Sequence, residues 1–292
     1  MLGGKILSKL LRTTSAAGAV FAGVLCTSAF LPPASAADEK IPMFSPAPNK
    51  GWVPDRPTGD DFIPVPGMPS PVMSDPKHPY VPNGGGRQPT YRVADLTNPI
   101  LKPWAIEKMK KANDDVLAGK VPYITRERCW PAGVPGSLVF TRGGQPLFFY
   151  QTKEKIEIVN ELNFETRHIY LNVPHSKNPK PSWYGESVGH YEGDELVIDT
   201  IGLNDRTTTD NYRTPHTDQI HVVERYKLIE GGKILQATIT VDDPGTFNMP
   251  WNAVQRWRQT DRILEENPCA ENNSEFLGYN VVPIPHADKP DF

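Results

Sequence analysis

The chain has 292 residues and a formal net charge of −3, with 31 Lys and Arg residues against 34 Asp and Glu residues. Because the basic residues are dispersed and nearly balanced by acids, the chain lacks the positive surface that nucleic-acid binding requires, and we exclude nucleic acid as a partner. Its 31 prolines are about twice the usual share, which predicts irregular segments around a smaller folded core.

Residues 1–36 have the features of an export signal. They comprise a positively charged start with Lys5, Lys9 and Arg12, an apolar stretch over 16–30, and an A-x-A cleavage motif at their end. No later apolar run approaches the roughly 18 to 20 residues that a membrane-spanning helix needs. We therefore expect a signal peptide, no transmembrane segment, and a mature protein that is periplasmic or secreted.

Removal of the signal leaves two cysteines, Cys129 and Cys269. An even number of cysteines in an oxidising compartment favours a disulfide between them. Two separate buried thiols are the alternative.

Segment 37–102 is rich in Pro, Gly, Asn and Asp and has almost no hydrophobic periodicity. Proline withholds a backbone donor, so we expect an extended arm that docks on the domain through separated aromatic residues. Segment 103–120 is expected to form the one helix, because its apolar residues recur every three to four positions. Pro103 suits the first helical turn and Gly119 the C-terminal cap.

The remaining pattern predicts a β domain over 121–273, followed by a tail over 274–292. Alternating apolar residues and Gly-containing turns indicate strands over 138–141, 147–153, 156–163, 165–173, 185–191, 195–201, 219–228, 234–241 and 251–260. An antiparallel meander of this kind must protect its edges, so we expect it to close into a lipocalin-like or related curved barrel. A two-sheet sandwich is the alternative.

The expected strand 219–228 places a carboxylate on its apolar face. Alternation puts Glu224 on the same side as Tyr226, with apolar neighbours. A buried carboxylate must be paired or hydrogen-bonded, and burial can move such a group into the range useful for proton transfer. Glu224 is therefore a candidate acid–base residue. The alternative is that it pairs with an arginine, such as Arg167 or Arg256, and only holds strands together.

The expected hairpin 185–201 has small residues at every second position of its first strand. They leave room on one face for a ligand or for a bulky aromatic side chain such as Trp183 or Trp257. In the second strand, either Asp199 or Thr200 must face an apolar environment. We expect ligand contacts from Trp183, Tyr191, Tyr226 and Trp257.

Histidines near this hairpin complete the candidate site. His216 and His221 lie on either side of the start of the expected strand 219–228, and His190 lies in the hairpin. One of them, oriented by Asp218, Asp199 or Glu224, could perform general acid–base catalysis. A metal site is less favoured, because the spacing does not make the side chains converge, and we expect no metal. Each histidine could also be a plain hydrogen-bonding residue.

Ser187 lies in a G-x-S-x-G sequence, but this segment leads into a β-turn and not into a helix, so we do not expect a nucleophile elbow. With both cysteines bonded, a catalytic thiol is also disfavoured. An exported protein meets few nucleotide cofactors, so we expect a reaction that needs no cofactor.

Several motifs resemble a large family of exported bacterial proteins that carries the signature W-x-G-x-S-x-G-x-[WY]-E-G-D-x-L-V-[VI]-D-T. The matching runs, which cover roughly 122–273, are WYGESVGHYEGDELVIDTIGLND (183–205), PHTDQIHVVERY (215–226), TVDDPGTFNMPW (240–251), CWPAGVPG (129–136) and PCAEN (268–272). The resemblance implies secretion and a shared β-rich domain. It supplies no catalytic residues.

Together these patterns predict an exported barrel protein that acts on a small organic molecule, because a barrel of about eight strands can hold one ligand. A cofactor-independent lyase, isomerase or hydrolase is the first hypothesis. A carrier for an apolar ligand is the second, and an envelope structural protein is the third. Inward titratable groups beside a cavity would favour the enzyme, and a filled barrel would favour the structural protein.

Overall fold

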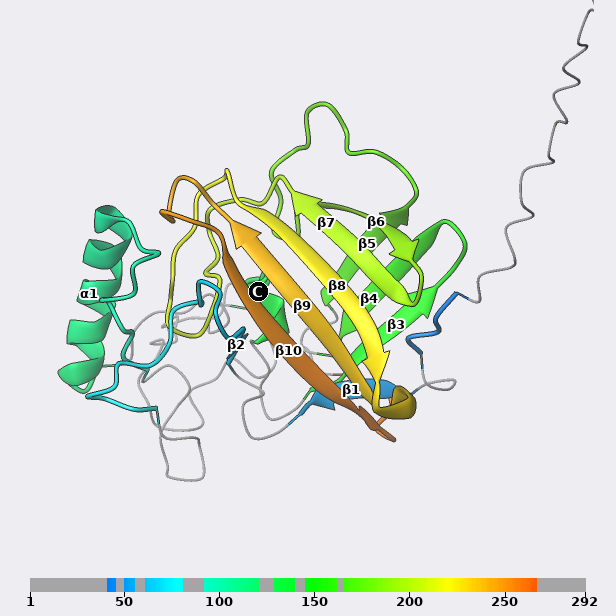
Figure 1. Ribbon diagram of the computed structural model, residues 1–292, viewed down its shortest axis with the longest axis horizontal. Coiled ribbons are helices and arrows are strands. Elements are labelled where there is room, and N and C mark those ends of the chain that lie inside the picture. The colour runs from blue at the N-terminus through cyan, green and yellow to red at the C-terminus, as the bar shows by residue number, and fades with distance from the viewer. Residues whose placement is uncertain are drawn as a thin grey trace, which may run out of the picture. The chain divides into compact units, whose positions relative to one another are not determined.

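Figure 1 shows the computed structural model of the chain. The structure describes residues 41–45, 50–55, 61–80, 92–120, 129–139, 145–161 and 165–266. All of them belong to the compact unit Lys40–Phe292. The expected signal peptide (1–36) and C-terminal tail (274–292) lie outside the described residues.

The fold is mainly β, with one sheet and one α-helix, α1 (Pro103–Leu117), in the described part of the chain. Two short 3-10 helices lie at Gly136–Leu138 and Glu230–Gly232. The strands are β1 (Gly51–Pro54), β2 (Ile63–Pro64), β3 (Leu147–Gln151), β4 (Lys155–Asn160), β5 (Glu165–Leu171), β6 (Glu186–Glu192), β7 (Glu195–Ile201), β8 (His221–Ile229), β9 (Ile234–Asp242) and β10 (Trp251–Thr260).

The sheet closes on itself, as the sequence predicts. Its order is β1-β3-β4-β5-β6-β7-β8-β9-β10-β2, and β10 also pairs with β1 (Figure 1). Strand β2 pairs with Ala253 and Val254, on the edge of β10 whose far end pairs with β1, and the other strands form a closed barrel. The expected mainly β, lipocalin-like barrel with one helix is confirmed.

The strand that closes the barrel comes from the Pro-rich segment, which was expected to be an arm on the surface. Trp52 of β1 pairs with Leu147 of β3 on one side and with Gln259 of β10 on the other. Its side chain is buried, and its Nε1 donates to the Phe44 carbonyl at 2.6 Å. The segment thus supplies part of the barrel wall.

One strand pairing departs from the expected antiparallel meander. Strands β5 and β6 pair in parallel, with Ile169 opposite Ser187, because the long connection 172–185 returns the chain to the same end of the sheet. The expected strand over 138–141 is also absent at Leu138, which ends a 3-10 helix. The N–H groups of Leu138 and Val139 close this turn onto the carbonyls of Pro135 and Gly136.

Helix α1 begins at Pro103, as expected, and Gly119 follows it with a φ of +75°. Its buried face comprises Ala105, Met109 and Asn113. In the described residues, no helix has the length and apolar character needed to cross a membrane.

Large aromatic side chains fill the middle of the barrel. Tyr226 and Trp257 are fully buried and stacked, with ring centroids 6.2 Å apart, and Phe149 meets Tyr226 edge-on at 5.7 Å. Full burial of each such side chain contributes roughly 1.5–3 kcal/mol. The interior of the barrel is thus a packed core in this region.

Cys129 is disulfide-bonded. Its expected partner, Cys269, lies outside the described residues, so the pairing of these two cysteines stays a prediction.

Candidate functional site

The barrel interior contains a polar network that crosses four strands. Arg167 Nη2 donates to Glu224 Oε2 at 2.5 Å and to Thr200 Oγ1 at 2.7 Å, while Arg167 Nε donates to Ser187 Oγ at 3.1 Å. The Tyr226 hydroxyl donates to Glu224 Oε1 at 2.8 Å. Burial alone would lower the pKa of Arg167, but the charge of Glu224 outweighs it and raises that pKa. Both carboxylate oxygens of Glu224 are therefore engaged within the protein.

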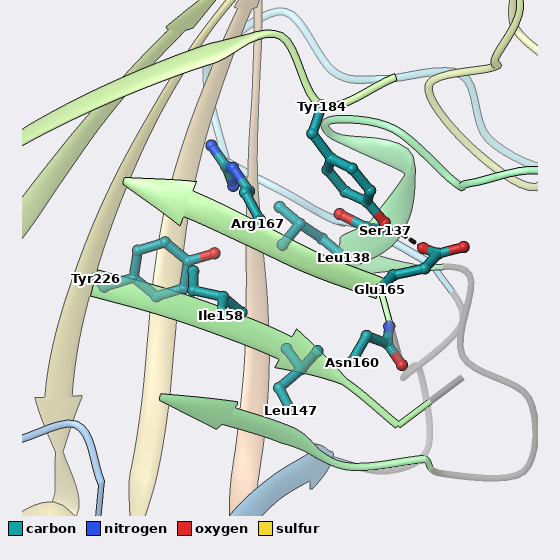
Figure 2. A pocket seen from close by; sticks show the side chains of 9 residues that line it. All are labelled: Ser137, Leu138, Leu147, Ile158, Asn160, Glu165, Arg167, Tyr184 and Tyr226. Atoms are coloured by element: carbon teal, nitrogen blue, oxygen red, sulfur yellow. Dashed lines mark hydrogen bonds between the residues drawn. The ribbon is translucent and has the colours of Figure 1, made fainter. Parts of the chain in front are cut away.

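A second carboxylate, the partly buried Glu165 on β5, lies beside this network. Its Oε2 accepts a hydrogen bond from the Tyr184 hydroxyl, as Figure 2 shows. Burial raises the pKa of the Glu165 carboxyl, although the hydrogen bonds from Tyr184 and from the Ala132 N–H oppose this effect.

Arg167 and Tyr226 of the network, together with Glu165, line a small interior cavity (Figure 2). Its lining consists of Ser137, Leu138, Leu147, Ile158, Asn160, Glu165, Arg167, Tyr184 and Tyr226. The free volume is about 20 Å³, which is room for a water molecule and not for an organic ligand. The interior is therefore filled at the position where the sequence suggested a ligand.

A much larger cleft lies on the outer face of β5 and the start of β6, beneath the connection 172–185. Its volume is about 640 Å³, which is in the range of small-molecule sites. Because side chains alternate along β5, residues 166, 168 and 170 face outward while Arg167 and Ile169 face the interior. The lining comprises Thr166, His168, Tyr170, Ser176, Asn178, Lys180, Ser182, Trp183, Tyr184, Gly185, Glu186 and Ser187.

His168 is a titratable side chain in the wall of this cleft. It lies opposite Glu157 of β4 in the strand register, and His168 Nδ1 is 3.2 Å from Glu157 Oε1. Lys155 Nζ donates to the same oxygen at 2.7 Å. The hydrogen bond from Lys155, assisted by His168, lowers the pKa of Glu157 and keeps it ionised. The His168 side chain is 50% exposed, so its ring is accessible from the cleft.

A row of alternating carboxylates and histidines begins at the cleft and runs across β6, β7 and β8. His175 lies between two carboxylates, with Nδ1 at 3.0 Å from Glu186 Oε1 and Nε2 at 2.9 Å from Asp199 Oδ1. His221 Nε2 is 2.8 Å from the same Asp199 oxygen. The two histidines thus share the Asp199 carboxylate.

The row shifts the pKa values of its members. The hydrogen bond to Asp199 raises the pKa of His221, although partial burial opposes this effect. Burial by itself would raise the pKa of Asp199, but the hydrogen bonds from His221 and His175 outweigh it and lower that pKa. Hydrogen bonds from Ser176, followed by that from His175, lower the pKa of Glu186. The row is thus a set of hydrogen-bonded contacts that ties the connection 172–185 to the barrel wall.

His216 lies apart from both the cleft and the row. It is buried, with Nε2 at 2.8 Å from Thr207 Oγ1 and Nδ1 at 2.9 Å from the Thr217 carbonyl oxygen. Nδ1 donates to the carbonyl, so Nε2 accepts from the Thr207 hydroxyl, and the ring is neutral. Burial lowers the pKa of His216, in agreement with this arrangement.

His190 also lies apart, near the hairpin turn, where its Nε2 is 2.8 Å from Glu192 Oε1. The structure therefore does not bring the five predicted catalytic residues together. Asp199 and His221 are in contact, whereas Glu224 lies in the interior and the other two lie elsewhere. Of the two residues in the returning strand, Thr200 is the one that faces the interior.

The four expected ligand contacts are also dispersed. Trp183 lines the outer cleft, while Tyr226 and Trp257 are packed inside the barrel, and the Tyr191 hydroxyl accepts a hydrogen bond from Gln151 Nε2 at 3.0 Å. The space beside the small residues of β6 is occupied by the core, because a Cβ at Gly189 would lie 2.9 Å from Ile169 Cγ2.

The sequence reasoning missed His168, Glu157, His175 and Glu186. Strand alternation places His168 of ETRHIYL (165–171) and Glu157 of KIEIVN (155–160) on the outward faces of their strands. An antiparallel pairing of these two strands could then have placed the two side chains beside each other. No local signal identifies His175, because it lies in an irregular connection and its partners are on two different strands.

The described residues contain no cluster of three or more His, Cys, Asp or Glu side chains that could hold a metal ion. The resemblance to a family of exported bacterial proteins stays a prediction. No family model, curated protein or solved structure matches this chain.

Proposed function

We propose that the protein is a cofactor-independent acid–base enzyme, of the lyase, isomerase or hydrolase type, that acts on a small organic molecule in the outer cleft. His168 exchanges the proton, and Glu157 orients its ring. The contact of 3.2 Å between His168 Nδ1 and Glu157 Oε1, made by a histidine in the cleft wall, is the observation that carries this proposal.

The chemistry follows from the two ring nitrogens. Glu157, whose Oε1 is 3.2 Å from Nδ1, favours the tautomer with the proton on Nδ1, which leaves Nε2 to accept a proton from the substrate. In an elimination or an isomerisation, Nε2 takes a proton from carbon and returns it to a leaving group or to a second carbon. In a hydrolysis, it takes the proton from the attacking water. A positioned group of this kind contributes about 10²–10⁴-fold to the rate.

The interior is a poorer choice for this chemistry. Glu224 is fully buried and both of its oxygens are hydrogen-bonded, and the adjacent cavity has a volume of only about 20 Å³. The export signal expected at residues 1–36 would place the enzyme in the periplasm or outside the cell.

A carrier that binds without turnover is the second candidate function. The aromatic side chains of Tyr170 and Trp183 in the cleft lining favour it, because ligand sites combine such surfaces with a few polar groups.

The test compares the wild type with His168→Asn and with His190→Gln. His190 is a matched control, because its side chain is also 50% exposed and paired with a glutamate but does not line the cleft. The three proteins are incubated with a metabolite extract, and altered and retained compounds are followed by mass spectrometry. We expect conversion by the wild type and by His190→Gln, and a rate lower by about 10²–10⁴-fold in His168→Asn at an unchanged melting temperature.

Conversion that His168→Asn leaves intact would overturn the role of His168. Recovery of one unaltered compound from all three proteins would replace the enzyme by the carrier.

A further inference from the structure

We infer that the outer cleft selects planar organic acids and that Lys180 binds their carboxylate. This inference deepens the proposed function and rests on the same cleft. The carboxylates at the cleft already have partners within the protein, whereas the ammonium group of Lys180 has none in the described residues, and the inference follows from this difference.

The carboxylates around the cleft are occupied. Glu186 Oε1 accepts hydrogen bonds from the Ser176 N–H at 2.7 Å and from His175 Nδ1 at 3.0 Å. Glu157, which borders the cleft through His168, is bound by Lys155. Both carboxylates thus already accept hydrogen bonds from within the protein.

Lys180 differs from these groups. It lines the cleft, is exposed, and forms no ion pair with any residue in the described part of the chain. A second cation lies nearby, because the Arg206 guanidinium is 5.8 Å from the centroid of the Trp183 ring, and among the described residues it also has no carboxylate within ion-pair distance. The Lys180 ammonium is therefore free to bind an anionic ligand without first leaving a carboxylate of the protein.

The backbone holds Lys180 in place. Pro179 and Pro181 flank it and fix the backbone φ on both sides. Pro179 packs against Gly202, where a Cβ would lie 2.9 Å from the Pro179 Cβ. Ser182, which follows Pro181, donates its N–H to the Gly202 carbonyl at 3.0 Å. The backbone that carries Lys180 is thus a fixed part of the cleft wall.

The shape of the ligand follows from the aromatic lining. Tyr170 lines the cleft and is 51% exposed, so a planar body could stack on its ring. The hydroxyl and amide groups of Thr166, Ser182 and Asn178 add neutral hydrogen-bonding partners. A conjugated or aromatic carboxylic acid has both required features, namely one negative charge and one flat apolar surface.

The test measures the binding of cinnamate and of its neutral isostere cinnamamide by titration calorimetry. We expect the wild type to bind the acid about tenfold more tightly than the amide, as a charge-assisted hydrogen bond in a partly exposed site allows. In Lys180→Met, the affinity for cinnamate should fall about tenfold and that for cinnamamide should not change. Lys177→Met is the matched control, because Lys177 is an exposed lysine of the same connection that does not line the cleft.

Equal binding of the acid and the amide, binding of neither compound, or an equal effect of the two lysine variants would overturn the inference. The same titrations with His168→Asn separate it from the proposed function. An acid preference that persists in His168→Asn, without turnover by the wild type, would retain the inference and reject the enzyme. If the wild type converts neutral compounds in a way that depends on His168, and shows no preference for acids, the enzyme would be retained and the inference on Lys180 rejected.

Discussion

Arg167 and Glu224 form an ion pair inside the barrel, and their side chains are only 5% and 0% exposed. They come from β5 and β8, which are separated in the sheet by β6 and β7. Ser187 and Thr200 bridge the gap, because both accept hydrogen bonds from the guanidinium. The network therefore spans the parallel pairing of β5 with β6 and links the two sides of this unusual junction.

Loss of either member of this ion pair should destabilise the fold strongly. Glu224→Gln leaves the Arg167 charge buried without compensation, and Arg167→Met leaves the Glu224 charge in the same state, so we expect a loss of ~3–5 kcal/mol for each single variant. The double variant Arg167→Met/Glu224→Met should recover part of this loss, because no charge is left buried. Urea unfolding measures all three.

Glu192→Gln is the surface control for this series. Glu192 pairs with Arg225 at 2.5 Å, but both side chains are more than a third exposed, so its loss should cost much less than the loss of the buried pair. A buried-pair variant that unfolds at the same urea concentration as the wild type, yet loses activity, would restore Glu224 as a catalytic residue.

The interior of the barrel could largely be predicted from the sequence, because strand alternation is a local property. The pattern of 219–228 correctly placed Glu224 and Tyr226 on the inward face, and Arg167 was one of two expected partners. By contrast, the pairing of β1 with β10 and the parallel pairing of β5 with β6 join distant segments. Local patterns do not encode such pairings, since they depend on how connections fold back.

The outer cleft could not be predicted for the same reason. It exists only where the connection 172–185 folds over β5, and this connection has no periodicity. The sequence analysis therefore placed the site where histidines are most frequent along the chain. His168 and His175 instead come from separate segments that only the fold brings together.

Burial of neutral His216 should make stability depend on pH on the acid side. Its pKa is lowered in the folded state, so below about pH 6.5 the unfolded chain binds a proton that the folded protein does not. The stabilisation is fully present above pH 6.5 and is lost as the pH falls toward the lower folded-state pKa. In His216→Gln, the unfolding free energy should vary less between about pH 7 and pH 5. An unchanged slope in urea titrations over this range would contradict the assignment.

His221 should show the opposite dependence. Its pKa is raised by Asp199 in the folded state, so its stabilisation is fully present below about pH 6.5 and is lost as the pH rises through the folded-state pKa. The side chain is 43% exposed, so after solvent screening we expect only ~0.5–1 kcal/mol. An NMR titration should give His221 a raised pKa in the wild type and a lower pKa in Asp199→Asn, because the largest cause of the rise is then removed. A titration that Asp199→Asn leaves unchanged would show that another group causes the shift.

The last prediction concerns His175, which ties the connection 172–185 to β6 and β7 through Glu186 and Asp199. His175→Gln cannot donate to both carboxylates in the same geometry, so the connection should open locally. We expect faster amide hydrogen exchange over 172–180 and little change in global unfolding, because local openings are governed by local contacts.

Residues 182–184 serve as the internal reference for this measurement. Ser182 bridges Leu203 and is hydrogen-bonded to Gly202 independently of His175, so its exchange should not change. Since the connection also covers the outer cleft, the same variant should bind cinnamate more weakly than the wild type. Unchanged exchange over 172–180, or an equal acceleration throughout the barrel, would show that His175 does not hold this segment in place.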